Sequence, residues 1–109
     1  MKKYVYIFTR QDLSPEQIVV QSSHVTMKMG YYLGKSPKSE DPDTTHFVLV
    51  GVRNEEALLA VVEILTSFNY QYEVFIESDE IGVTSVSTYP IDEDKKGILQ
   101  AFNLMKMGR

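Results

Sequence analysis

Two separate stretches of this sequence carry side chains that could do chemistry. The first, from Arg10 to His24, combines a cation with carboxylates, carboxamides and an imidazole. The second, from Phe75 to Ser85, places carboxylates and hydroxyls where one apolar run ends and the next begins. A carboxylate in such a place can act as a general base on water, and an imidazole can assist the proton transfer. We therefore expect one site built from both stretches, in which Asp79 and His24 converge.

The first stretch predicts a helix whose N-terminus faces the exit of a strand. Ser14 is a favourable N-cap, Pro15 suits the first helical position, and Gln17 completes a capping box with Ser14. The backbone amides at such an N-terminus favour an anion or a polarised carbonyl. Because strand exits are where α/β sheets usually place their sites, we expect the ligand here.

Helical spacing divides this predicted helix, residues 15–33, into faces. We expect a buried face and, beside it, a polar stripe that is either a solvated side of the helix or the rim of a pocket at Gln21 and His24. Val20 and Met27 point away from the core, which predicts contact with another element or with a second copy in a homodimer. The buried face comprises Ile18, Ser22, Val25 and Met29, and the stripe comprises Gln17, Gln21, His24 and Lys28.

The second stretch has a plainer interpretation as well. Ser, Asp and Gly are the residues expected in any hairpin turn, so residues 78–82 could be a turn and nothing more. Common catalytic and phosphate-binding motifs are absent, including G-x-x-x-x-G-K and H-E-x-x-H. The run Ser22-Ser23-His24 does not make a catalytic triad, because neighbours along a helix point in different directions.

Composition narrows the class of protein. A chain of 109 residues predicts a single domain, residues 1–109, and the absence of cysteine excludes disulfides and thiol chemistry. With two histidines we expect no metal site.

The net charge of −4 disfavours a general nucleic-acid binder but allows a local basic patch, formed by Arg10 with Lys95 and Lys96. No apolar run could span a membrane, so we expect a soluble, cytoplasmic protein.

The apolar pattern predicts an α/β fold with the order β-α-β-α-β-β-α. We expect a small mixed four-stranded sheet with helices on both faces, in which strands 4–8 and 47–52 are central and parallel. The strand at residues 83–89 is less apolar, which predicts an edge position. A last helix should begin at Asp92 and dock through Ile98, Phe102 and Met105, with Lys106 and Arg109 at its end.

The two stretches together resemble the type II peptidyl-tRNA hydrolase superfamily, and more closely its small bacterial and phage-like relatives. The run RQDLSP at residues 10–15, followed by VQSSH at 20–24, is similar to the family's opening motif. The run FIESD at residues 75–79, followed by TS at 84–85, resembles its second motif. The similarity covers nearly the whole chain, including the order of strands and helices.

This resemblance implies hydrolysis of the ester between a peptide and the 3′ ribose of tRNA, without a metal or organic cofactor and often by a dimer. Asp79 would activate water, His24 would assist proton transfer, and the oxyanion would face the helix amides near Gln17. The expected ligand is tRNA or a nucleotide. The candidate substrate-binding residues are Arg10, Asp12, Gln17, Gln21, Glu77, Thr84 and Ser85.

The chain departs from the family pattern in the turn before the helix. Family members carry a Gly- and Lys-rich segment there, with a lysine thought to be catalytic, whereas residues 14–17 are Ser-Pro-Glu-Gln. A second hypothesis follows from the missing lysine. In it the fold is retained without the chemistry, which leaves a protein that binds or sequesters a nucleotide, an RNA end or a protein partner.

Overall fold

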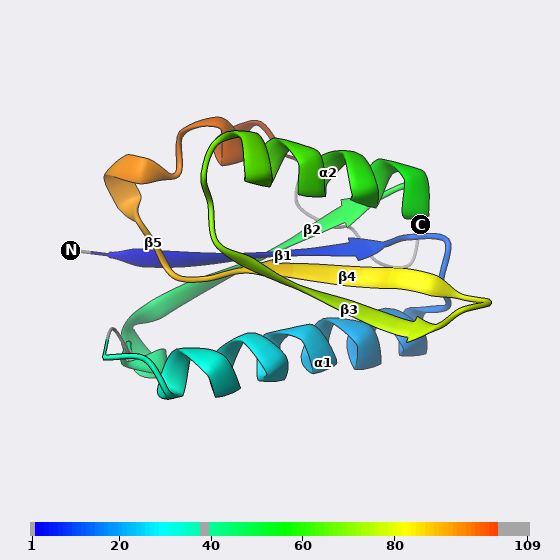
Figure 1. Cartoon of the computed structure of the whole chain (residues 1–109), viewed down its shortest axis with the longest axis horizontal. Coiled ribbons are helices and arrows are strands. Elements are labelled where there is room, and N and C mark those ends of the chain that lie inside the picture. Colours follow the sequence, from blue (N-terminus) through cyan, green and yellow to red (C-terminus); the bar gives the residue numbers. More distant parts are fainter. Residues whose placement is uncertain (1, 38–39, 103–109) are drawn as a thin grey trace.

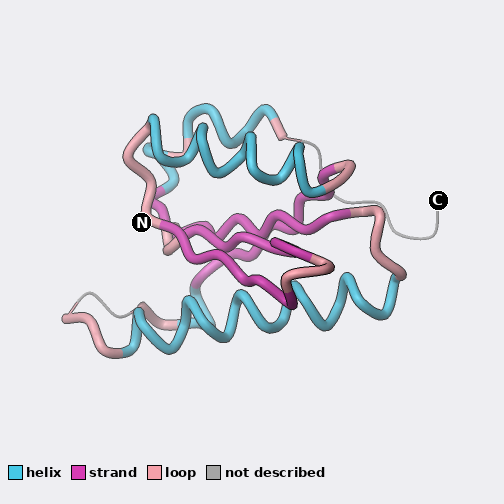
Figure 2. The backbone as a smooth tube through the Cα atoms, turned by 45° about the vertical axis from the view of Figure 1, so that its right-hand side comes forward, coloured by secondary structure: helices cyan, strands magenta, loops and turns pink. Residues whose placement is uncertain are grey.

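The computed structural model describes residues 2–37 and 40–102 as one sheet between two helical layers. Helix α1 covers one face of the sheet and α2 covers the other, as the two views show (Figures 1 and 2). In chain order the elements are β1 (Lys3–Arg10), α1 (Pro15–Gly34), the 3₁₀ turn η1 (Pro42–Thr44), β2 (Thr45–Val52), α2 (Glu55–Ser67), β3 (Tyr72–Ser78), β4 (Gly82–Thr88), β5 (Ile91–Asp92) and the 3₁₀ turns η2 (Glu93–Lys95) and η3 (Gly97–Ala101).

The sheet has the strand order β2-β1-β4-β3 and is mixed. Strands β1 and β2 are parallel along their whole length, while β4 runs antiparallel to both β1 and β3. The two-residue strand β5 pairs with the start of β1 and makes a fifth strand that the sequence did not predict. The predicted α/β class and the parallel pairing of the first two strands are confirmed.

Two predicted strand positions are wrong. Strand β4 is central and not at an edge, and its residues Thr84 to Thr88 are all fully buried. Strand β2 is at an edge and not central, and the side chain of Phe47 is 49% exposed. The prediction failed because it equated burial with apolar side chains, whereas β4 fills a central position with small hydroxyl side chains that find hydrogen-bond partners.

The two faces of β1 explain its continuous apolar run. Val5 and Ile7 pack with α1, while Tyr6 and Phe8 belong to the larger cluster beneath α2. The expectation that both faces of this strand are covered is therefore confirmed. Helix α1 buries Ile18, Val25 and Met29 as predicted, but its fourth buried residue is Gln21 and not Ser22.

The last predicted α-helix is replaced by two short 3₁₀ turns. Gly97, the first residue of the second turn, has a positive φ of 28°, which redirects the chain after the first turn. Leu99 is fully buried and the ring of Phe102 packs edge-on against Phe8 at 5.1 Å, whereas the predicted docking residue Ile98 is 39% exposed. The other residues of the predicted helix, Met105, Lys106 and Arg109, lie outside the described residues.

Candidate functional site

A buried carboxamide joins the two stretches that the sequence singled out. The side chain of Gln21, on α1, donates from Nε2 to Glu77 Oε2 at 2.5 Å and accepts at Oε1 from the hydroxyl of Thr84 at 2.7 Å. Its backbone carbonyl accepts from the hydroxyl of Ser85 at 2.8 Å. The structure therefore brings together four of the predicted site residues in one hydrogen-bonded group, which we call the Gln21 network (Gln21, Glu77, Thr84 and Ser85).

An irregularity in the sheet allows both hydroxyls to reach α1. The β3–β4 ladder pairs Phe75 with Ser85 and Ile76 with Val83, so Thr84 is an extra residue on β4. Neighbouring side chains on a regular strand point to opposite faces, and a bulge redirects one of them. Because of this bulge, Thr84 and Ser85 both donate hydrogen bonds to Gln21.

A further hydrogen bond between side chains lies beside the Gln21 network, between helix α1 and the sheet. The hydroxyls of Thr9, on β1, and Ser22, on α1, lie 2.7 Å apart. Among the described residues, no buried side-chain nitrogen or oxygen is left without a partner. The buried polar side chains between α1 and the sheet are thus all hydrogen-bonded, which is the condition under which buried polar groups hold a structure rigid.

Glu77 is the carboxylate that Gln21 holds. It lies near the end of β3 with an exposed side chain, and Gln21 holds its Oε2. Its other oxygen, Oε1, accepts no hydrogen bond from the described residues. One carboxylate oxygen of Glu77 is therefore held by Gln21, and the other is free to contact solvent at the end of β3.

Asp79 and His24 have separate surroundings. The imidazole of His24 packs edge-on against Phe75 at 4.6 Å, one turn along α1 from Gln21. Asp79 lies in the β3–β4 turn, four residues beyond Phe75 in the direction of the helix N-terminus. Asp79 and His24 share no hydrogen bond or ion pair in the described part of the chain. Their convergence at one site therefore stays a prediction.

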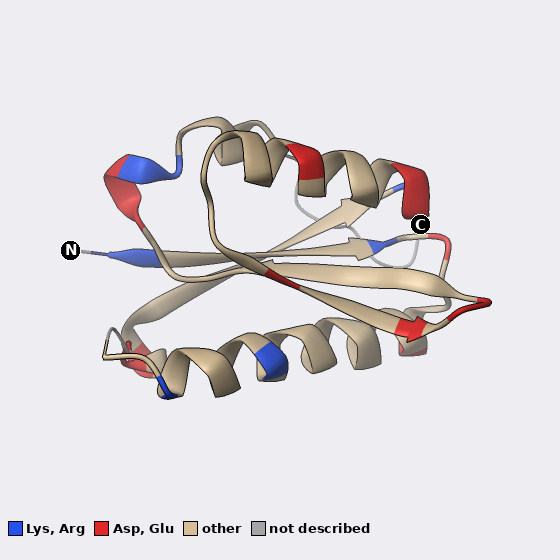
Figure 3. Ribbon diagram, in the orientation of Figure 1, with Lys and Arg blue, Asp and Glu red and all other residues tan. Residues whose placement is uncertain are grey.

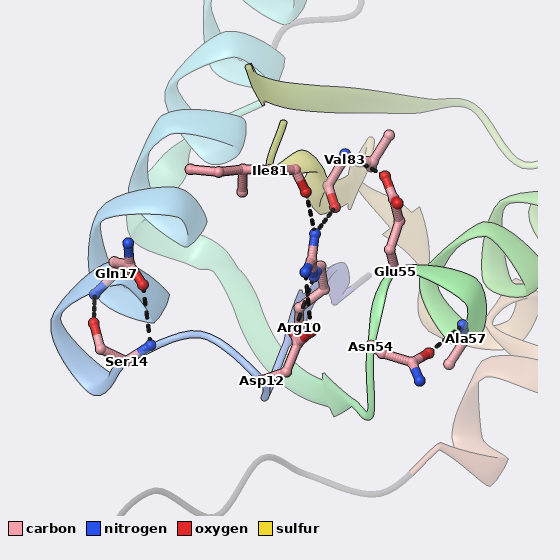
Figure 4. Close-up of polar contacts among 9 residues, drawn as sticks. All are labelled: Arg10, Asp12, Ser14, Gln17, Asn54, Glu55, Ala57, Ile81 and Val83. Atoms are coloured by element: carbon pink, nitrogen blue, oxygen red, sulfur yellow. Dashed lines mark hydrogen bonds and ion pairs between the residues drawn. The ribbon is translucent and has the colours of Figure 1, made fainter. Parts of the chain in front are cut away.

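Arg10 has its own set of partners, drawn in Figure 4. The guanidinium makes a two-pronged pair with Asp12, at 2.9 Å for both contacts, and donates to the carbonyls of Ile81 and Val83. The hydrogen bonds between Arg10 and Asp12 raise the pKa of Arg10 and lower that of Asp12, outweighing the opposite effect of partial burial. Arg10 thus connects the end of β1 to the β3–β4 turn, and Asp12 holds its guanidinium in place.

Glu55, which sequence reasoning missed, also holds the start of β4 in place. Glu55, in the first turn of α2, accepts a hydrogen bond from the backbone amide of Val83 at 2.7 Å (Figure 4). The preceding Gly82 has a φ of 82°, and a Cβ there would clash with the Glu55 carboxylate. Sequence reasoning missed this role because the contact joins residues 28 positions apart.

The predicted helix N-terminus is confirmed, and two of its backbone amides already have partners within the chain. Ser14 and Gln17 form the expected capping box, with the Gln17 amide donating to Ser14 Oγ and the Ser14 amide to Gln17 Oε1 (Figure 4). The next amide, of Ile18, donates to the Ser14 carbonyl at 2.9 Å. The amides of Gln17 and Ile18 therefore serve the helix itself, and an oxyanion near Gln17 would have to compete for them.

The charges around this end of the sheet are mostly acidic. Figure 3 shows acidic residues at the β3–β4 turn and at the N-terminal ends of both helices. Arg10 is at this end of β1, whereas Lys95 and Lys96 follow β5, which pairs with the other end of the same strand. These cations are separated by about 20 Å along an eight-residue strand. The single basic patch expected from the sequence is therefore corrected to two distant groups.

Comparison with known proteins establishes the fold and nothing more. No protein-family model and no curated protein matches the chain. A solved structure, the protein of unknown function Atu0240 from Agrobacterium tumefaciens strain C58, is similar over 97% of this chain and 99% of its own, with a TM-score of 0.69 and 12% sequence identity.

Within the described residues, no three side chains of the metal-binding types come together, and no helix is long and apolar enough to cross a membrane.

Proposed function

We propose that this protein hydrolyses the ester between a peptide and the 3′ ribose of tRNA, in the cytoplasm where that ester is formed. The observation that carries the proposal is the Gln21 network. Gln21, Glu77 and Thr84 belong to the two motifs on which the family resemblance rests, and they come from segments more than 50 residues apart in sequence. Direct hydrogen bonds among residues chosen for that resemblance support a shared site.

In this proposal Glu77, and not Asp79, is the general base. Its open oxygen Oε1 accepts a proton from water, and the resulting hydroxide attacks the carbonyl carbon of the ester. The bond between that carbon and the ribose oxygen then breaks, and the 3′ oxygen leaves as a hydroxyl with the proton that Glu77 had accepted from water. Gln21 acts as a positioning residue because it holds the other oxygen of Glu77 and does not itself face solvent.

A second candidate function, binding without hydrolysis, is supported by a different observation. Several groups that would stabilise negative charge already have protein partners, namely the guanidinium of Arg10 and the amides of Gln17 and Ile18. Acidic side chains surround the strand exit, which disfavours a phosphate-rich ligand such as a nucleotide or RNA end. Of the ligands considered for such a protein, a protein partner with a basic segment fits these charges best.

One assay separates the two candidates. Purified wild-type protein is incubated in excess with peptidyl-tRNA, beside an active control enzyme and a sample without protein. Release of peptide above the background without protein is the result that we expect. No release by well-folded protein would contradict the hydrolase proposal and favour binding, which titration with labelled tRNA and with a basic peptide would then characterise.

A further inference from the structure

A hollow lies at the end of the sheet opposite the Gln21 network, between the segment that leads from α2 into β3 and the chain around β5. Strand β3 begins beside it at Tyr72, whereas Glu77 lies near the other end of that strand. Its volume of about 380 Å³ is within the range of pockets that hold small molecules. We call it the β5 hollow and define it by Lys3, Phe68, Asn69, Gln71, Asp92 and Lys95 among its lining residues.

Backbone hydrogen bonds fix the walls of the β5 hollow. Asn69 follows α2 in the left-handed conformation, with a φ of 61°, which is common just beyond a helix. The Gln71 carbonyl accepts from the Tyr89 amide at 3.0 Å, and the Tyr70 hydroxyl donates to the Lys95 carbonyl at 2.7 Å. The segments before β3 and around β5 are therefore joined, so a ligand in the hollow has little backbone to order when it binds.

Three polar side chains at the hollow have no partner within residues 2–37 and 40–102. The carboxamides of Asn69 and Gln71 and the ammonium of Lys95 make no hydrogen bond or ion pair with this part of the chain. Asp92, by contrast, is ion-paired with Lys3, and the hydrogen bond from Lys3 lowers the pKa of Asp92. The hollow therefore offers one unpaired positive charge and two amide groups that can donate hydrogen bonds.

We infer that the β5 hollow binds a small aromatic monocarboxylate. Lys95 supplies the cation for its carboxylate, and the amide N–H groups of Asn69 and Gln71 supply hydrogen bonds. The ring of the ligand packs on Phe68, whose side chain lines the hollow and is 56% exposed in the free chain. This site is separate from the Gln21 network, so the inference does not depend on the proposed hydrolysis.

The charges of the hollow favour an anion with a single charge. The lining carries two ammonium groups, of Lys3 and Lys95, and one carboxylate, of Asp92. Glu40, which also lies 3.4 Å from the Lys3 ammonium, lines the neighbouring hollow and not this one. The β5 hollow is thus locally positive on a chain of net charge −4. A group with two or three negative charges would meet more repulsion, because the two residues after Asp92 are also acidic.

Titration of the ¹⁵N-labelled protein with phenylacetate, followed by backbone amide chemical shifts, tests the inference. We expect saturable shifts at Gln71 and Lys95, which line the hollow, and none at Ser85 in the Gln21 network. Phenylacetamide has the same ring and no charge, so it should bind about fivefold more weakly, the scale of one partly exposed ion pair.

Variants test which groups carry the affinity. Lys95→Gln should weaken phenylacetate binding about fivefold because it removes the unpaired charge. Asn69→Gly removes a carboxamide but keeps the left-handed backbone, so it should also weaken binding without unfolding the protein. Arg53→Gln is the matched control, since it changes the net charge equally at an exposed residue at the other end of the sheet, and its affinity should stay within about twofold of wild type.

Three results would overturn the inference. The absence of saturable shifts up to about 10 mM phenylacetate would show that the hollow does not bind this class of ligand. Equal affinity for phenylacetamide would show that the charge of the carboxylate is not recognised. Unchanged affinity in folded Lys95→Gln, or an equal loss in Arg53→Gln, would place the binding outside the β5 hollow or reduce it to attraction by net charge.

Discussion

The two flanks of α1 differ in how far the chain itself covers them. On the side of β3, Gln21 reaches Glu77 and the ammonium of Lys28 donates to the Val74 carbonyl at 2.8 Å. On the side of β2, Met27 borders an apolar groove that nothing in the described chain fills. One helix therefore separates a polar flank that is completed within the chain from an apolar flank that the described chain leaves exposed.

The largest effect should come from removing the carboxamide on the polar flank. Gln21→Ala deletes the acceptor of the buried Thr84 hydroxyl and the donor to Glu77, and leaves a cavity under the helix. We expect a loss of about 3 kcal/mol in the free energy of unfolding, measured by urea denaturation. Gln17→Ala is the matched control on the same helix, and should cost only about 0.5–1 kcal/mol because it removes half of a capping box. Equal losses for both would contradict the special role of Gln21.

Two glycines provide the next test. Gly82→Ala forces a side chain into the left-handed region and displaces the Glu55 carboxylate, so we expect a loss of about 2 kcal/mol in unfolding free energy. Gly30, on the groove side of α1, has open space where a Cβ would lie, with no heavy atom within 4 Å outside the helix's own neighbouring backbone. Gly30→Ala should therefore stabilise the helix by about 0.5–1 kcal/mol. Thermal denaturation of the two variants should move the midpoint in opposite directions, and a shift of the same sign in both would contradict this account.

The smallest effect concerns the Arg10–Asp12 pair. Hydrogen bonds from Arg10 lower the pKa of Asp12 in the folded protein, so the pair contributes stability above the ordinary aspartate pKa and loses it as pH falls through the folded value. Because the pair is partly exposed, we expect Asp12→Asn to cost less than about 1 kcal/mol at neutral pH. The difference between wild type and variant should shrink towards zero in acid. A constant difference from neutral to strongly acidic pH would show that the charge of Asp12 does not matter.

The features that were predicted correctly depend on residues close together in the sequence or on the way the chain connects two strands. The capping box of Ser14 and Gln17 and the parallel pairing of the first two strands depend on near neighbours and on chain connectivity, and both were predicted correctly. The central position of β4 was missed because hydroxyl side chains look exposed until their partners on α1 are known.

The site was predicted in part for the same reason. The residues of the Gln21 network were named from motif spacing, but the hydrogen bonds that join them depend on a bulge in β4 and on the packing of α1 against β3 and β4, which motif spacing does not give. The partners of Arg10 and Glu55 lie in and beside the β3–β4 turn, and no pattern near either residue indicates contacts over such sequence distances.

The central claim is that Glu77, held by Gln21, is the reactive carboxylate, and a comparison of two variants tests it most directly. Glu77→Gln and Asp79→Asn are each nearly isosteric changes of one exposed carboxylate, two residues apart. Initial rates of peptide release from peptidyl-tRNA are measured for both beside wild type, after circular dichroism has shown equal folding. We predict that Glu77→Gln lowers turnover by about 10²-fold or more, the usual scale for losing a general base, while Asp79→Asn changes it only slightly. A large loss confined to Asp79→Asn, or wild-type activity retained by Glu77→Gln, would contradict the account.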